Sequence, residues 1–201
     1  MSDVDYGTVA STTRDRLLAA AREVIEEGGY AAASVAAIAD RAGVAAGTLY
    51  RHFASKEELF VEVFRSVGER EEQAMRAAAA EMQDAPAAER LQVVLTTFAR
   101  RALRNPRLAW ALIAEPVDPR VDAERIAYRE RYAELIATGL AAGISEGDLP
   151  SQDVRLTAAA LVGGCGEALV GPLSPLAAGE PDADEVVEAL RAFVARAVGA
   201  R

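Results

Sequence analysis

The chain has 201 residues, of which 51% are hydrophobic, and its formal net charge at pH 7 is −9. The apolar content excludes a disordered chain, and the length suits one or two domains with a buried core. The single cysteine excludes an intrachain disulfide. Because no signal peptide or membrane span is recognisable, we expect a cytoplasmic protein.

The N-terminal region predicts a tail followed by a helix. Residues 1–12 carry acidic side chains and no basic ones, so we expect a disordered tail. A threonine at position 12 or 13 can cap a helix over about Thr13 to Glu27, whose apolar residues recur on one face. The glycine pair that begins at Gly28 then ends this helix.

The next segment predicts two short helices joined by a tight turn. Ser34 is suited to cap a helix of about Val35 to Arg41, and Gly43 supplies the left-handed backbone that turns the chain. A second helix of about Ala45 to His52 turns its leucine inward and leaves its other side exposed. This pattern is typical of a helix-turn-helix, which places its second helix in the DNA major groove. The alternative is an ordinary pair of helices in a bundle.

The stretch from Ala39 to Leu59 reads A-D-R-A-G-V-x-x-G-T-L-Y-R-H-F-x-S-K-E-E-L and resembles the DNA-binding signature of the tetracycline-repressor (TetR-type) family. The rest of the chain resembles that family only in its helix pattern. The resemblance implies a ligand-responsive transcriptional regulator, commonly a repressor, released from its operator by a small, largely apolar molecule. One such DNA-binding domain carries few cationic groups. We therefore expect a homodimer whose two DNA-binding domains, here called heads, bind a palindromic DNA sequence.

Several side chains in this stretch are candidates for DNA contact. By the resemblance and by their chemistry we assign Ser34, Thr48, Tyr50 and Lys56 to phosphates, with His52, Arg41 and Arg51 as weaker candidates. The second helix begins Ala45, Ala46, Gly47, where the family often has a capping residue and a longer polar one. Alanine can touch a thymine methyl but offers no hydrogen bond to a base edge. We therefore expect sparse direct readout, with specificity from dimer spacing and DNA shape.

The negative net charge does not exclude DNA binding. From Thr12 to Phe60 there are six basic and seven acidic residues, so this region is near neutral and most of the excess acid lies elsewhere. DNA binding needs a local basic face, and acidity elsewhere limits non-specific binding.

The remainder of the chain predicts helices alone. Ser55, with Glu58 completing a capping box, opens a linking helix that continues to about Gln83. Further helices are expected over about Ala87–Arg104, Asn105–Ala114, Val121–Gly143, Ser151–Val170 and Ala183–Val198, with Gly171-Pro172 ending the fourth of these. We predict an all-α fold with a tail (1–12), a three-helix DNA-binding domain containing the helix-turn-helix (13–55) and a larger helical ligand-binding and dimerisation domain (56–201).

The C-terminal domain is expected to hold a ligand pocket among its helices. The candidate lining residues are Phe98, Trp110, Glu115, Tyr128, Tyr132 and Cys165, with Arg129 and Glu167 as further polar contacts. The alternative is that these aromatic residues are plain core. In the mechanism we expect, a ligand that prefers one spacing of the heads shifts the dimer away from its DNA-bound arrangement.

Three glycines indicate a close approach of another backbone. Gly163, Gly164 and Gly166 lie in an otherwise helical stretch, where each costs roughly 1 kcal/mol relative to alanine. Such residues suit a subunit interface through the last two helices, or the wall of a ligand cavity.

Neither an enzyme nor a metal site is indicated. The single histidine, His52, lies in the reading helix and cannot pair with Cys165, so neither a Cys-His nor a Ser-His-Asp site is supported. We expect no cofactor and no zinc site. Two rival interpretations remain: a binding module whose DNA-reading head is idle, and an all-α enzyme that uses carboxylates such as Glu115 and Glu167.

Overall fold

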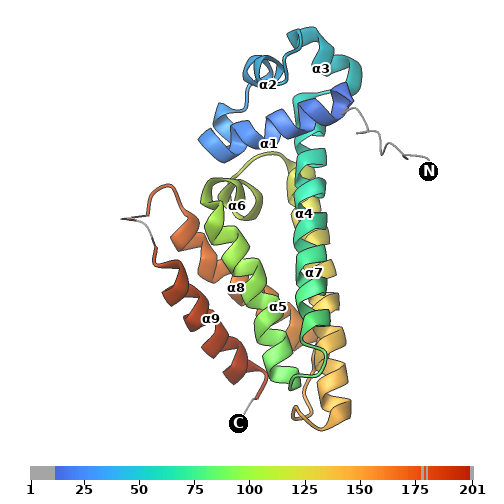
Figure 1. Ribbon diagram of the computed structural model, residues 1–201, viewed down its shortest axis with the longest axis vertical. Helices are drawn as coiled ribbons and strands as arrows, with labels where there is room; N and C mark the ends of the chain where they lie inside the picture. The colour runs from blue at the N-terminus through green and yellow to red at the C-terminus, as the bar shows by residue number, and fades with distance from the viewer. Residues whose placement is uncertain (1–11, 178, 180, 200–201) are drawn as a thin grey trace, which may run out of the picture.

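The computed structural model describes residues 12–177, 179 and 181–199, and over these residues it contains helices and no strand. The helices are α1 (Thr13–Ala32), α2 (Val35–Arg41), α3 (Ala46–His52), α4 (Lys56–Glu81), α5 (Ala87–Arg104), α6 (Pro106–Ile113), α7 (Pro119–Glu146), α8 (Val154–Leu173) and α9 (Ala183–Ala197). A small head of α1 to α3 lies at one end, and the long α4 runs from it into a body formed by α5 to α9 (Figure 1). The predicted all-α fold is confirmed; the tail expected over residues 1–12 lies, except for Thr12, outside the described residues.

Side-chain caps define the helices of the head. The Thr12 hydroxyl accepts the Asp15 N–H at 3.1 Å, and the Asp15 carboxylate accepts the Thr12 N–H in return. Gly29, at φ +75°, interrupts α1 close to its predicted end. Ser34 caps α2 by accepting the Ala37 N–H at 3.1 Å. These bonds satisfy backbone donors that have no partner inside the helix.

The turn of the helix-turn-helix forms as predicted. Gly43 has φ +66°, a conformation that side-chain-bearing residues rarely adopt, and it separates α2 from α3. Leu49 of α3 is fully buried and Phe53 nearly so, which anchors the second helix to the head. Ala45 precedes α3 without any side-chain cap. The capping bond that a serine or other polar residue would supply at this position is therefore absent.

The cap of α4 differs in part from the prediction. The Ser55 hydroxyl accepts the Glu58 N–H at 3.2 Å, as expected. The Glu58 carboxylate, however, accepts the N–H of Ala54 at 2.6 Å. The reciprocal bond therefore goes to the residue before the cap, and it fastens the end of α3 to the start of α4.

Helix α8 is the element that the sequence placed least well. It begins at Val154, with Asp153 accepting the Leu156 N–H at 2.9 Å, and it continues through Pro172 to Leu173. A proline in the last turn removes only one helical hydrogen bond. The burial of Leu169 and Leu173 in the body core holds that turn in place, so the expected break at Gly171-Pro172 is wrong.

Two hydrophobic clusters support the fold. The first contains the head and the first half of α4, and it also includes Leu108 and Ala111 of α6 and Val121 and Tyr128 of α7. The second fills the body between α5, α7, α8 and α9. Because body residues complete the core of the head, a movement of α6 or α7 must disturb the packing of α1 and α4.

By length and composition alone, α8 would be long and apolar enough to cross a membrane. Such a stretch is weak evidence, because core helices pass the same test. Five of its side chains, Ala158, Leu161, Cys165, Leu169 and Leu173, are buried in the body.

Candidate functional site

The exposed edge of α3 is the candidate DNA-reading surface. Tyr50 is 57% exposed. Also exposed are Ala45, Ala46, Gly47, Arg51 and His52, while Thr48 is half-buried. No other described part of the chain covers this edge, so it is accessible to a large partner. The DNA contacts themselves remain predictions.

The cationic candidates of the head differ in how they are already engaged. The Arg41 guanidinium pairs with the carboxylates of Glu27 at 2.6 Å and Glu23 at 3.3 Å. The hydrogen bond that Arg41 donates to Glu27 raises the pKa of Arg41 far above its usual value. To bind a phosphate, Arg41 would have to exchange these partners. Lys56 and Arg51 have no carboxylate partner among the described residues. The Lys56 ammonium lies 4.7 Å from the ring centre of Tyr30.

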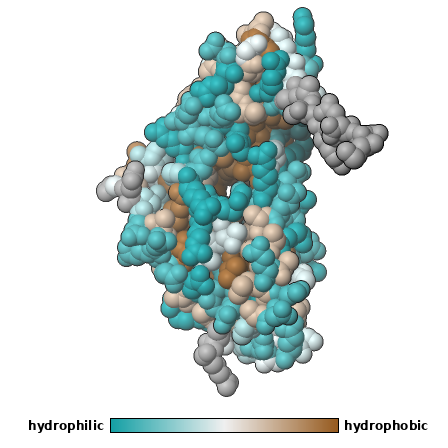
Figure 2. All heavy atoms as spheres, viewed as in Figure 1, coloured by the Kyte–Doolittle hydropathy of each residue, from teal (hydrophilic) through white to brown (hydrophobic). Residues whose placement is uncertain are grey.

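A cavity of about 320 Å³ lies in the body beneath the head. Of the predicted lining residues, it brings together Phe98, Tyr128, Arg129, Tyr132 and Cys165. Figure 2 shows hydrophobic side chains in a hollow on this face of the molecule, bordered by hydrophilic ones. The wall is therefore mainly apolar and aromatic, as is usual for small-molecule sites.

Three predicted residues do not line this cavity. Leu108, Ala109, Leu112 and Ile113 of α6 face the cavity, whereas Trp110 points away and packs against the body core. The Glu115 carboxylate accepts the Tyr30 N–H at 3.2 Å, so it joins the body to the end of α1. Glu167 lies on the exposed side of α8. These three residues therefore lie outside the cavity, because helical spacing does not tell which neighbour a face meets.

The aromatic wall is fastened to α4. The Tyr128 hydroxyl donates to the Arg65 carbonyl at 3.0 Å, and the Tyr132 hydroxyl donates to the Gly68 carbonyl at 3.3 Å. A Cβ at Gly68 would lie 2.6 Å from the ring of Tyr128, so only glycine allows this approach. A ligand that moves either tyrosine therefore acts directly on the helix that leads to the head.

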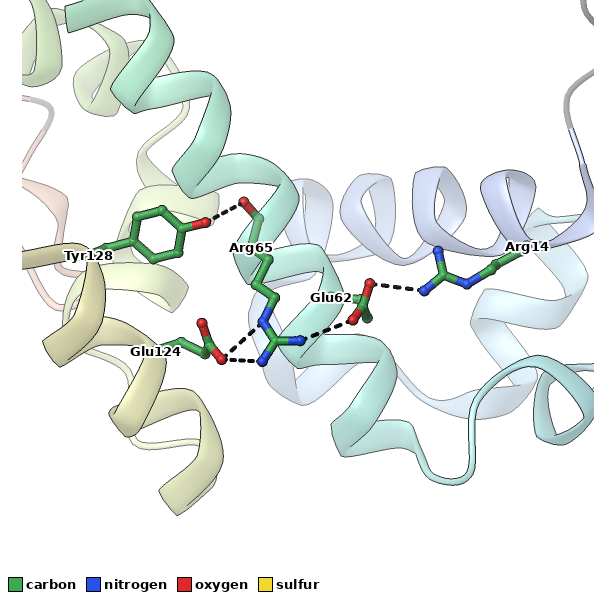
Figure 3. Close-up of polar contacts among 5 residues, drawn as sticks. All are labelled: Arg14, Glu62, Arg65, Glu124 and Tyr128. Carbon is green, nitrogen blue, oxygen red and sulfur yellow. Dashed lines mark hydrogen bonds and ion pairs between the residues drawn. The ribbon is translucent and has the colours of Figure 1, made fainter. Parts of the chain in front are cut away.

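A chain of ion pairs runs beside these tyrosines. Arg14 of α1 pairs with Glu62 at 2.9 Å, Glu62 pairs with Arg65 at 3.2 Å, and Arg65 donates to Glu124 of α7 at 2.9 Å (Figure 3). Exposed pairs of this kind contribute only about 0–1 kcal/mol each. These pairs matter more for orientation than for stability, because they connect α1 of the head, the linking helix α4 and α7 of the body in one row.

Arg125 of α7 holds the C-terminal end of α6. Its guanidinium donates to the carbonyls of Ala111 and Leu112, both at 2.8 Å, and to the carbonyl of Glu115. These carbonyls lie at and beyond the end of α6, where helical partners are lacking. The side chain is only 11% exposed and also lines the cavity, so Arg125 connects cavity, α6 and the Glu115 contact with α1.

Comparison with known proteins identifies the family. The family described as "Bacterial regulatory proteins, tetR family" matches residues 17–63, and the "Tetracyclin repressor-like, C-terminal domain" matches residues 84–169. The HTH-type transcriptional repressor KstR of Mycobacterium tuberculosis is 33% identical over 155 residues, which cover 76% of this chain and 68% of KstR. The chain belongs to the TetR family.

Solved structures show the same fold. The fatty acid degradation regulator FadR from Bacillus halodurans has a TM-score of 0.77 at 24% identity, with 94% of this chain and 96% of that chain covered. FadR from Bacillus subtilis, in complex with stearoyl-CoA, has a TM-score of 0.69 at 22% identity, covering 92% of this chain and 98% of that chain. Together with the family matches, this makes the TetR-family chain a ligand-responsive, DNA-binding transcriptional regulator.

Sequence reasoning missed most of the polar residues around the cavity of this TetR-family protein. Arginines from four helices line it, and only Arg129 was anticipated. Since these arginines lie on four helices that are far apart in the sequence, no local pattern could have brought them together.

Cys165 gives a chemical probe of this cavity. Burial raises the pKa of its thiol to about 11, so the reactive thiolate should be roughly a hundredfold scarcer at neutral pH than for an ordinary cysteine. We expect iodoacetamide to modify the folded protein very slowly and the urea-unfolded protein quickly, as followed by mass spectrometry. As the only cysteine, Cys165 gives an unambiguous signal. Rapid modification of the folded chain would show that the cavity wall opens freely.

Proposed function

We propose that this TetR-family regulator is a cytoplasmic homodimeric repressor, released from a palindromic operator when a small, largely apolar molecule fills the cavity. In this proposal residues 13–55 form the DNA-binding domain, residues 56–201 form the ligand-binding and dimerisation domain, and no cofactor or catalysis is involved. The supporting observation is the apolar cavity. Its Tyr128 and Tyr132 donate hydrogen bonds to carbonyls of α4, and the ring of Tyr128 packs directly against Gly68 of that helix.

The dimer is proposed to form through α8 and α9. The outer side of α8 presents Leu156, which is 68% exposed, followed by Ala160 and Gly163 on the same stripe. A Cβ at Gly163 would meet no other atom of its own chain within 4 Å. Packing within the protomer therefore does not explain why this position is a glycine. A smooth apolar stripe of small residues fits the close approach of a second helix.

Release is proposed to follow a shift between two arrangements of the dimer. A ligand against Tyr128 and Tyr132 repacks the first half of α4, and a movement of α6 reaches α1 through Glu115. Either route changes the distance between the two heads. Because operator half-sites have a fixed spacing, a changed head distance weakens binding to DNA.

The apolar character of the effector is proposed from the wall of the cavity. Phe64, Val67, Leu95, Phe98 and Val162 contribute to it. Bacillus subtilis FadR, which shares the fold, was solved with stearoyl-CoA, a molecule with a long apolar chain. Compounds with saturated hydrocarbon chains therefore belong in the first screen for release.

The reading surface can be tested with a double variant. Tyr50→Ala with Lys56→Ala should weaken binding to the DNA upstream of the protein's own gene by at least about tenfold, because two phosphate contacts are lost. Electrophoretic mobility shift measures this. Ile126→Ala with Glu130→Ala, an exposed pair on α7, is the matched control and should bind normally. Unchanged binding by the Tyr50 and Lys56 variant would contradict the proposed surface.

A further inference from the structure

The charge of the cavity lining is opposite in sign to the net charge of the whole chain. The chain as a whole carries a net charge of −9. The cavity lining contains the six arginines Arg22, Arg70, Arg101, Arg104, Arg125 and Arg129, but only two glutamates, Glu26 and Glu71. In an acidic protein, this local excess of positive charge requires an explanation.

Folding accounts for only some of these arginines. Arg101 makes a two-pronged pair with Glu71 at 2.6 and 2.9 Å, and Arg125 holds the end of α6. Arg22 meets Glu26 at 3.4 Å, a loose contact between neighbouring turns of α1. Within the described residues, Arg70, Arg104 and Arg129 have no carboxylate partner. These three and Arg22 form what we call the arginine rim.

The arginine rim spans both parts of the molecule. Arg70 belongs to α4, Arg104 to the last turn of α5 and Arg129 to α7, and all three are exposed at the solvent side of the cavity. Arg22 belongs to α1, which is a helix of the head. A molecule in the cavity is thus within reach of the DNA-binding domain itself.

We propose that the effector is an amphipathic anion whose apolar part lies in the cavity and whose charged end binds the arginine rim, contacting Arg22 of the head directly. The inference rests on the proposed function of the cavity as the effector site. Guanidinium groups match carboxylate and phosphate oxygens in two-pronged geometry, and the apolar wall accepts a hydrocarbon chain. The charged end then ties α1 to the body in one arrangement, without a relay through α4 or α6.

The charge requirement is tested with three probes of equal chain length on the full-length protein. Decanoate and decanoyl-CoA carry a carboxylate and phosphates, respectively, whereas 1-decanol is neutral. Isothermal titration calorimetry should show at least one anion binding about tenfold or more tightly than the alcohol, as one charge-assisted contact predicts. The tighter anion identifies whether the rim takes a carboxylate or a phosphate.

The contact with the head is tested with variants on α1. Arg22→Gln should weaken the preferred anion about tenfold and leave 1-decanol unchanged. Glu26→Gln removes a neighbouring negative charge, so it should bind the anion at least as tightly as the natural protein does. Arg100→Gln is the matched control, since Arg100 is exposed on α5 and does not line the cavity.

A DNA-release assay distinguishes a role of the Arg22 contact in release from a role in anion affinity alone. At saturating anion, Arg104→Gln should still leave the DNA, because it alters the body alone, whereas Arg22→Gln should remain bound. Equal affinities for alcohol and anions, or an Arg22→Gln protein that binds and releases normally, would overturn this inference and leave the proposed function intact. If none of the three probes binds, the inference also falls. The proposed function itself fails if no compound in a broad screen releases the DNA.

Discussion

Replacing Ala160 with arginine is expected to convert the protein to monomers and to abolish operator binding. Ala160 lies on the exposed stripe of α8, between Leu156 and Gly163. In the proposed dimer this stripe meets its symmetry mate, so each dimer would bury two arginines without partners. The penalty for an unpaired buried charge is several kcal/mol, enough to weaken dimerisation by roughly a thousandfold.

Loss of the dimer should carry over to DNA. A single head presents few free cations, because Arg41 and Arg14 are already paired with glutamates. We expect a monomer to bind a half-site at least about a hundredfold more weakly than the dimer binds the palindrome, since the two heads no longer act together. Analytical ultracentrifugation and mobility shift measure the two effects.

The control for this variant is Ala77→Arg, which adds the same charge at an exposed position of α4. This protein should remain dimeric and bind DNA. If Ala160→Arg remains a dimer at micromolar concentration, the interface lies elsewhere on the molecule.

Arg125→Met is expected to destabilise the protein by about 2–4 kcal/mol, lowering Tm by roughly 5–15 °C. The variant keeps the apolar length of the side chain and removes the donors that hold the carbonyls of Ala111, Leu112 and Glu115. Those carbonyls are partly buried, so leaving them unpaired is costly. Scanning calorimetry measures the change.

The same substitution should weaken the connection between body and head. Once the end of α6 is released, Glu115 is no longer positioned to accept the Tyr30 N–H. We expect a lower affinity for DNA even without effector. Arg129→Met, one turn further along α7 and without a carboxylate partner among the described residues, should leave Tm nearly unchanged. A normal Tm for Arg125→Met would show that water replaces the guanidinium at little cost.

The elements that the sequence predicted well are those with local signals at both ends. The helix of Ala87–Arg104 has a proline before it and an asparagine after it, and the helix-turn-helix has Ser34 and Gly43. Helix α8 starts later than predicted because Asp153 caps it, and it ends later because tertiary packing of Leu169 and Leu173 outweighs the local effect of Pro172. Burial of apolar side chains therefore outweighs local helix propensity at this end of α8.

The candidate site divides in the same way. The exposed edge of α3 could be predicted, since it is a single short segment whose spacing separates inner from outer residues. The cavity could be predicted only in part: Tyr128, Tyr132 and Cys165 line it, but Trp110 and Glu115 do not. Which faces meet depends on the crossing of five or more helices, and the arginine rim is assembled from four of them.

The alanines at the start of α3 have a consequence for how such a regulator changes over time. Ala45, Ala46 and Gly47 are all exposed, and none of them belongs to either hydrophobic cluster. In the proposed reading surface, a single mutation to a polar residue there would add a group for a base edge and remove no buried contact, so we expect new operator preferences to arise without a folding penalty. Duplicated copies of this gene could thus diverge to control different promoters while keeping one scaffold.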